Sequence, residues 1–325
     1  MNRLLAVMCA LAAMIGIGQP AGAQEYPARP IRMLVPFAPG GNTDILARAV
    51  AQRMTDSWHT PIVVDNRPGG NGFIAADIAA RATPDGHTVF VGTSREVSIN
   101  TVLFKKLPYD PVKDFAPVTL GTVSAMLFAA HPSFSGNTLR DIVSQAKSKP
   151  GSISIGTPGV GTPMHLTLEW FNILIGAKTI HVPYKGGGPL GAALLGGQEV
   201  KLGIIGMGPA VPHIRAGRIK PIALTTAKRS KLLPGVPTAQ EEGLKDLDTT
   251  IWFAFYVPAG TPKKVLGKLH GELVRILRLP DVVNYLENVT GVDVEPGTPQ
   301  ELARFAKAEA AKYGKIMKAS GMKPQ

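Results

Sequence analysis

Two glycine-rich loops carry the residues best suited to binding chemistry. Residues 36–44 read PFAPGGNTD and residues 156–165 read GTPGVGTPMH, and each loop follows a short apolar run and precedes an amphipathic one. Glycine lets the backbone approach a ligand closely, and the first N–H groups of a helix lack intrahelical partners and carry partial positive charge. Such a turn is a site for a carboxylate or phosphate. Either loop alone could be an ordinary strand-to-helix turn, but one in each half favours a shared anion cleft.

A third loop contains a formal G-x-G-x-x-G pattern. Residues 186–191 read GGGPLG after Tyr184 and Lys185. Pro189 interrupts the pattern, and the position about 20 residues on, where a dinucleotide site needs an acid, is Gly206. We therefore expect a cleft loop in which Tyr184 and Lys185 face a ligand, and not a nucleotide site.

Arg95 and Glu96 form a charged pair just after the apolar run 87–91 and Gly92-Thr93-Ser94. In open α/β sheets, ligands bind beyond the carboxyl ends of the strands, and a guanidinium can hold a carboxylate through two parallel hydrogen bonds. We expect Arg95 to engage a second carboxylate of the ligand, which favours dicarboxylates or aromatic acids. Glu96 could instead recognise an amine, which favours an acidic amino acid, and a solvated surface pair is the remaining alternative.

Signatures of catalysis are missing from the sequence. It contains no G-x-S-x-G elbow, no H-E-x-x-H pair and no phosphate-loop lysine motif, and its seven histidines are scattered. We therefore expect no catalytic residue, no metal and no cofactor.

Short strands and helices alternate around these loops. This alternation through glycine-rich turns favours parallel sheets in an α/β fold. The expected strands are 31–37, 62–65, 87–91, 152–155, 179–183, 201–205 and 219–225, and the expected helices include 45–54, 139–149 and 165–175.

Two long apolar segments, 115–131 and 248–258, lack a helical period. We expect them to be two strands that cross between two lobes, with C-terminal helices over 263–277, 281–287 and 299–319 returning to the first lobe. Lobe 1 then comprises residues 24–125 plus 251–325, and lobe 2 comprises 126–250. One continuous α/β domain is the alternative.

The N-terminus resembles a secretory leader. Residues 1–23 combine Arg3, an apolar run over 4–17 and a small-residue cleavage site, Ala21-Gly22-Ala23. The apolar run is shorter than the roughly 18–20 residues that span a bilayer. We expect a cleaved signal peptide and a soluble periplasmic protein, whose one cysteine, Cys9, leaves with the leader.

The composition excludes disorder but leaves a basic charge to explain. Of 325 residues, 45% are hydrophobic and 18% charged, and the formal net charge is +12. Without Arg3 the charge is +11, and it is scattered along the chain with no basic cluster or aromatic-interleaved stripe. We therefore expect no nucleic-acid partner.

Taken together, the motifs resemble those of the substrate-binding proteins of tripartite tricarboxylate transporters, the Bug family of periplasmic solute receptors. The likeness runs along nearly the whole chain after the leader. It rests on the order and spacing of YPARPI (26–31), PFAPGGNTD (36–44), VDNRPGG (64–70), PDGHT (84–88), LPYDP (107–111), GTPMHL (161–166) and HVPYKG (181–186).

This resemblance implies a type II periplasmic-binding-protein fold, in which two α/β lobes joined by two crossing strands close on one small carboxylate. In the family, loop backbone and bridging waters hold one carboxylate. The chain departs from the family pattern at Arg95-Glu96 and at 205–208, IGMG, where an Asp or Asn is frequent. The ligand-binding residues expected here are Phe37, Ala38, Gly41, Asn42, Thr43, Arg95, Gly156, Thr157, Gly161, Thr162, Tyr184, Lys185 and Met207.

The expected function is that of a monomeric receptor which captures a dicarboxylate, an aromatic acid or an acidic amino acid by lobe closure. The receiver would be integral-membrane transporter subunits or a sensor protein. An exported α/β enzyme acting on a small organic acid is the alternative, which the missing nucleophile motifs disfavour.

Overall fold

The first half of the fold is a parallel sheet covered by helices. The computed structural model describes residues 25–324, so the expected leader over 1–23 lies outside the described residues. Strand β1 (Ile31–Val35) pairs in parallel with β2 (Ile62–Asn66) on one side and with β3 (Thr88–Thr93) on the other. The helices of this first half are α2 (Asn42–Trp58), α3 (Phe73–Ala80), the short α4 (Asn100–Leu103), α9 (Lys263–Leu277), α10 (Pro280–Thr290) and α11 (Pro299–Ser320).

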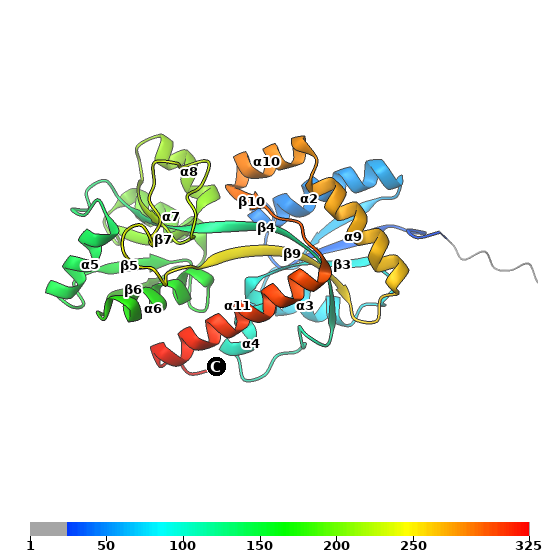
Figure 1. The fold of residues 1–325 in the computed structure, drawn as a ribbon, viewed down its shortest axis with the longest axis horizontal. Coiled ribbons are helices and arrows are strands. Elements are labelled where there is room, and N and C mark those ends of the chain that lie inside the picture. Colours follow the sequence, from blue (N-terminus) through cyan, green and yellow to red (C-terminus); the bar gives the residue numbers. More distant parts are fainter. Residues whose placement is uncertain (1–24, 325) are drawn as a thin grey trace, which may run out of the picture.

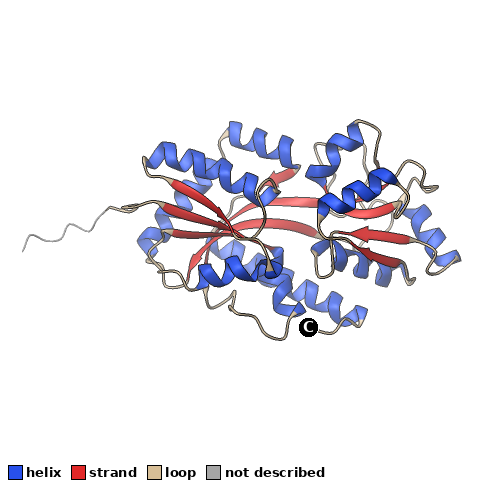
Figure 2. Cartoon of the chain, turned by 180° about the vertical axis from the view of Figure 1, so that it is seen from behind, coloured by secondary structure: helices blue, strands red, loops and turns tan. Residues whose placement is uncertain are grey.

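The second half repeats this arrangement. Strand β5 (Ser154–Thr157) pairs in parallel with β6 (Ile180–Pro183) and with β7 (Leu202–Gly206). The helices of this half are α5 (Leu139–Ser148), α6 (Pro163–Ile175), α7 (Gly187–Gly196) and α8 (Met207–Arg215). Figure 2 shows helices on both faces of the strands in each half.

Two long strands join the halves. β4 (Phe115–Ala130) and β9 (Thr250–Pro258) pair antiparallel and run side by side through the middle of the molecule (Figure 1). β9 also pairs with β3 in the first half, and β4 pairs with β7 in the second. The sheet order is β2-β1-β3-β9-β4-β7-β5-β6, and β8 (Lys220–Leu224) and β10 (Val292–Val294) also pair with β4. The two apolar segments without helical period are thus the crossing strands.

Each half has its own hydrophobic core. In the first, Met33 and Val35 of β1 pack with Phe255 of β9 and with the helices α2 and α9. In the second, Phe128 of β4 packs with Phe171 of α6. The inner strands β1, β3 and β7 are therefore buried along nearly their whole length, as expected where helices cover a parallel sheet, whereas the edge strands β2 and β6 are only partly buried.

The C-terminal helix differs from expectation. It was expected to return to the first lobe, but α11 packs against both halves. Tyr313 and Ile316 of α11 share a buried cluster with Ile99 and Leu103 of the first half and with Leu166 of α6 in the second. Sequence periodicity shows that a helix has an apolar face but not which partners cover it, so the double contact could not be predicted.

Candidate functional site

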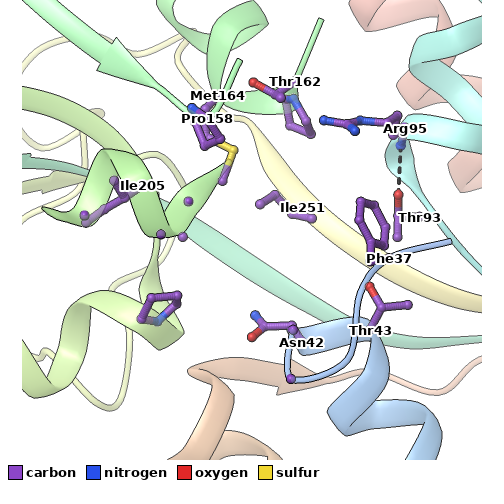
Figure 3. Close-up of a pocket in the computed structure, with 18 of the residues that line it drawn as sticks. Phe37, Asn42, Thr43, Thr93, Arg95, Pro158, Thr162, Met164, Ile205 and Ile251 are labelled. Atoms are coloured by element: carbon purple, nitrogen blue, oxygen red, sulfur yellow. Dashed lines mark hydrogen bonds between the residues drawn. The ribbon is translucent and has the colours of Figure 1, made fainter. Parts of the chain in front are cut away.

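A cavity of about 660 Å³ lies where the two halves meet over the crossing strands. Ile251 of β9 lies near its centre (Figure 3), and Phe253 of the same strand also lines it. From the first half it is lined by Phe37, Gly40, Gly41, Asn42, Thr43, Thr93 and Arg95. From the second it is lined by Pro158, Thr162, Pro163, Met164, Gly187, Gly188, Gly191, Ala192, Leu195, Ile205, Gly206, Pro209, His213 and Ile219.

Three helices direct uncapped N-termini at this cavity. The N-cap residues of α2, α7 and α8 are Gly41, Gly186 and Gly206, and none of these helices has a side-chain cap. A glycine cap leaves the first backbone N–H groups without the side-chain acceptor that serine, threonine or aspartate supplies. The partial positive charge of three helix ends therefore converges on one space.

Asp44 fixes the loop in front of α2. Its Oδ2 accepts hydrogen bonds from Gly40 N (2.9 Å) and Arg48 Nε (2.9 Å), and its Oδ1 accepts one from Asn66 Nδ2 (3.0 Å). Burial alone would raise the pKa of this carboxyl, but the hydrogen bonds from Arg48, Gly40 and Asn66 hold the pKa below its usual value. Asp44 thus holds the loop in place through these hydrogen bonds, but its side chain does not line the cavity.

The loop before α6 is held by its own side chains. Thr162 Oγ1 donates to Gly159 O (2.7 Å) and accepts from His165 N (3.2 Å), which caps the helix. Gly161 N donates to His165 Nδ1 (3.2 Å), so the proton of this imidazole is on Nε2, 3.5 Å from Glu169. These bonds fix the backbone that places Thr162 in the cavity wall.

A second histidine lies behind this loop. The His181 ring stacks on the His165 ring with centroids 4.2 Å apart, and His181 Nε2 is 2.7 Å from Thr157 Oγ1. Burial, with a smaller contribution from His165, lowers the pKa of His181 to about 4, and the charge of Glu169 opposes this. His181 is therefore a neutral support near pH 7.

Arg95 is the cation of the cavity. Its backbone N donates to Thr93 Oγ1 (3.2 Å), and its guanidinium carbon lies 5.8 Å from the centre of the Phe37 ring. In Figure 3 the side chain extends into the cavity toward the loop of Thr162. Within residues 25–324 the guanidinium has no hydrogen-bond or ion-pair partner. Burial lowers its pKa from the usual value, against the opposing effect of Glu96, so this is a desolvated charge.

Glu96 lies beneath the cavity and does not face it. Its side chain is fully buried, and Oε2 accepts from Thr93 N (3.0 Å) and Thr93 Oγ1 (2.6 Å). Burial raises the pKa of this carboxyl, against the opposing effects of the Thr93 bond and the Arg95 charge. The expectation that Glu96 could meet a ligand amine is therefore wrong for this arrangement, because the carboxyl has no exposed atom.

Of the thirteen expected ligand-binding residues, the structure brings six to the cavity wall. These are Phe37, Gly41, Asn42, Thr43, Arg95 and Thr162. They come from the two loops at helix starts and from the segment that follows β3. Anion sites are expected at these positions, because they lie at helix N-termini and beyond the carboxyl ends of strands.

The other seven do not line the cavity. Ala38 and Lys185 lie on exposed loop surface, Gly156 is packed under Leu190, and Gly161 faces Leu103. Thr157 is engaged by His181, and the Tyr184 hydroxyl donates to Glu199 (3.2 Å). The Met207 side chain is fully buried and packs against Gly291. These residues were expected because they adjoin a ligand loop in the sequence, but packing turns each of them away from the cavity or leaves it on the outer surface.

Sequence reasoning missed the wall formed by α7 and α8. Gly188, Gly191, Ala192 and Leu195 lie on one side of α7, and Pro209 and His213 are one turn apart on α8. The three- and four-residue spacing that puts residues on one helix face was visible in the sequence. Which face turns toward the cleft was not.

The wall carries no negative charge. Among the described residues that line it, none is Asp or Glu, whereas Arg95 is a cation. No group of three or more His, Cys, Asp or Glu side chains within residues 25–324 is arranged to hold a metal ion. None of the helices in that range is long and apolar enough to cross a membrane.

Comparison with known proteins gives one consistent result. Residues 46–322 match the family model described as tripartite tricarboxylate transporter family receptor. Protein BugT of Bordetella pertussis is 33% identical over 99% of both chains. The structure of R. palustris Rpa4515 with adipate superposes with a TM-score of 0.85 at 32% identity, covering 93% of this chain and 100% of that one. Periplasmic binding protein BugD gives a TM-score of 0.80 at 31% identity, covering 92% and 100%.

These likenesses confirm the expected architecture. The chain has the type II periplasmic-binding-protein fold, with two α/β lobes joined by two crossing strands and a cleft between them.

Proposed function

The chain belongs to the tripartite tricarboxylate transporter receptor family, the family expected from its motifs, and from that premise we propose that it binds a small carboxylate in the cavity between its lobes. The observation that carries the proposal is the unpartnered guanidinium of Arg95 in a cavity that also receives three uncapped helix N-termini and no acidic side chain. A partly buried cation without a partner loses hydration that nothing in the protein replaces, so the arrangement favours an anion that completes it.

Two places on the wall suit carboxylate oxygens. One is the start of α2, where the N–H groups of Asn42 and Thr43 are uncapped, and the other is the guanidinium of Arg95 near Thr162. A ligand with two carboxylates engages both, and the related protein Rpa4515 is described with adipate, a dicarboxylate. A charge-assisted hydrogen bond contributes about 1.5–3 kcal/mol, so a few of them support micromolar binding, about −8 kcal/mol.

Binding is coupled to the approach of the two lobes. We place lobe 1 at residues 24–125 plus 251–325 and lobe 2 at 126–250, so each lobe supplies one wall of the cavity. Both walls then contact the ligand only when the lobes are close, as in hinge closure around ligands. The closed form is the one that integral-membrane transporter subunits or a sensor protein receive.

The place of action is the periplasm. The leader-like residues 1–23 support export, and BugD is described as a periplasmic binding protein. The protein acts there as a monomeric receptor, and because its family is one of receptors, the ligand leaves chemically unchanged.

Native mass spectrometry of protein purified from the periplasm tests the proposal. The expected result is a non-covalent adduct that is released on denaturation and identified as a carboxylic acid. A screen of acids by thermal shift should then raise the melting temperature with the same compound. Release of a neutral or cationic solute, or conversion of the acid during incubation, would contradict the proposed function.

A further inference from the structure

A groove between α7 and α8 extends the cavity into lobe 2. Its walls are one face of α7 and one face of α8, and its floor is aliphatic. The residues of this α7–α8 groove are Gly188, Gly191, Ala192, Leu195, Pro209, His213, Ile205 and Ile219.

The groove is open because three α7 residues that line the cavity, Gly187, Gly188 and Gly191, lack side chains. A Cβ at Gly187, Gly188 or Gly191 would have no other heavy atom within 4 Å. By contrast, a Cβ at Gly156 would lie 2.5 Å from the Leu190 side chain, so that glycine is required for packing. None of these three cavity-lining glycines has the positive φ that favours glycine.

Glycine inside a helix is destabilising relative to alanine, because it loses more conformational freedom on folding. Gly191 lies in the middle of the ten-residue helix α7, where neither packing nor backbone geometry requires it. What its small size provides is space along the groove.

The chemistry of this space is apolar. Leu195, Ile205 and Ile219 offer only hydrocarbon to an occupant, and His213 is its one ionisable side chain among the described residues. A short hydroxy acid or an amino acid would leave the hydrocarbon uncovered and would lose hydration of its own polar groups.

We propose that the α7–α8 groove is the subsite that selects the ligand by binding an apolar body. A carboxylate lies at one of the two places formed by the start of α2 and by Arg95, and an aromatic ring or an aliphatic chain enters the groove. This inference rests on the proposed function and names its ligand class: aromatic and medium-chain carboxylates, in preference to short hydroxy acids and acidic amino acids.

Titration calorimetry with an acid series tests the selection. Acetate, butyrate, hexanoate and benzoate are compared with malate and glutamate on the same protein. Burial of one methylene changes affinity about fourfold, so affinity should rise by that factor for each methylene until the groove is filled. Stronger binding of malate or glutamate than of hexanoate and benzoate would overturn the groove inference alone, whereas no binding of any of the acids would overturn the proposed function as well.

Gly191→Leu isolates the groove from the carboxylate site. Leucine is a better helix former than glycine and would project into open space, so the variant should fold with an unchanged or higher melting temperature. It should bind hexanoate and benzoate at least tenfold more weakly while changing acetate affinity less than twofold.

Gly271→Leu in α9 is the matched control, because it also meets open space in a helix but does not line the cavity. It should leave every affinity unchanged. Equal binding of hexanoate by the parent and Gly191→Leu would overturn the inference.

Discussion

At the scale of single residues, Arg95 decides the chemistry of the cavity. Several other arginines of the described residues have carboxylate partners, such as Arg48 with Asp44 (2.9 Å) and Arg81 with Asp77 (2.8 Å). Arg95 has none within residues 25–324, although Glu96 follows it directly, because Glu96 turns beneath the cavity and bonds to Thr93. The neighbouring acid thus contributes to the electrostatic field without neutralising the guanidinium.

Arg95→Ala should therefore weaken carboxylate binding without destabilising the fold. Loss of a charge-assisted hydrogen bond of about 1.5–3 kcal/mol corresponds to a roughly 10- to 150-fold loss of affinity. The free energy of unfolding should stay the same or rise, since an unpaired desolvated charge is removed. Calorimetric titration and chemical denaturation measure the two quantities, with the exposed Arg81→Ala as the control.

The same variant tests the second-carboxylate role. If Arg95 holds the second acid group, the loss should be larger for a dicarboxylate such as adipate than for the monocarboxylate of equal length. Identical losses for both would refute that role while leaving Arg95 as an anion contact.

At the scale of elements, the site consists of helix starts. Gly41 has φ −83° and ψ 168°, which any residue adopts, and a Cβ there would meet nothing closer than Ala38 O at 4.0 Å. Glycine is thus not required at this N-cap by backbone strain or by packing. Its lack of a side-chain acceptor keeps the first N–H groups of α2 available to a ligand.

Gly41→Ser should therefore weaken carboxylate binding while it stabilises the protein slightly. A serine at the N-cap can accept from the α2 amides, which stabilises the helix by up to a few tenths of a kcal/mol relative to glycine. It competes with the ligand for those amides, so carboxylate affinity should fall by at least threefold while the melting temperature holds or rises. Gly235→Ser, at an exposed glycine with free space, should change neither. Unchanged affinity in Gly41→Ser would show that these amides do not bind the ligand.

The pair His165 and His181, behind the loop before α6, makes the stability of the fold depend on pH. The pKa of His181 is about 4 in the folded protein, below its ordinary 6.5, so the unfolded chain takes up this proton first as the pH falls. Stability should therefore decline as the pH falls from about 6.5 toward 4. His181→Asn should flatten that part of a melting-temperature profile, whereas His131→Asn should not. A parent profile that is flat between pH 6.5 and 4 would contradict the buried neutral state of His181.

The elements of the site differ in how far the sequence predicts them. The loops at 36–44 and 156–165 could be placed at helix starts because glycine, threonine and proline are typical of those turns. Thr162 lines the cavity, as the sequence predicts. Its neighbour Gly161 faces Leu103 instead, and the sequence does not show this because it depends on packing between distant residues. The α7–α8 wall could not be predicted, because its position depends on how lobe 2 packs against lobe 1.

At the scale of the whole molecule, two interlobe contacts flank the crossing strands. One is the buried cluster of α11 with α6 around Tyr313 and Leu166. The other joins the start of α8 to the end of α10, where Met207 packs against Gly291 and Lys231 lies 3.4 Å from Glu287. The first contact is fully buried and the second is small and partly exposed, so we expect the second to separate when the lobes open.

Gly208→Ala should obstruct closure. A Cβ at Gly208 would lie 2.5 Å from the carbonyl oxygen of Thr290 in the other lobe, so the two helices must move apart. The variant should fold normally, bind carboxylates more weakly and show less decrease in the radius of gyration on ligand addition in small-angle scattering. If ligand causes the same decrease as in the parent, the α8–α10 contact is not part of the closed form.

The central claim is that the cavity recognises a carboxylate through charge. Calorimetric titration of the intact protein with paired acids and amides, such as benzoate with benzamide, hexanoate with hexanamide and adipate with adipamide, tests it most directly. Each pair keeps the carbon skeleton and removes only the charge. We predict that the acid that binds best will lose at least 100-fold in affinity as its amide, about 2.7 kcal/mol. An amide that binds as tightly as its acid, or a series in which no acid binds, would contradict the account.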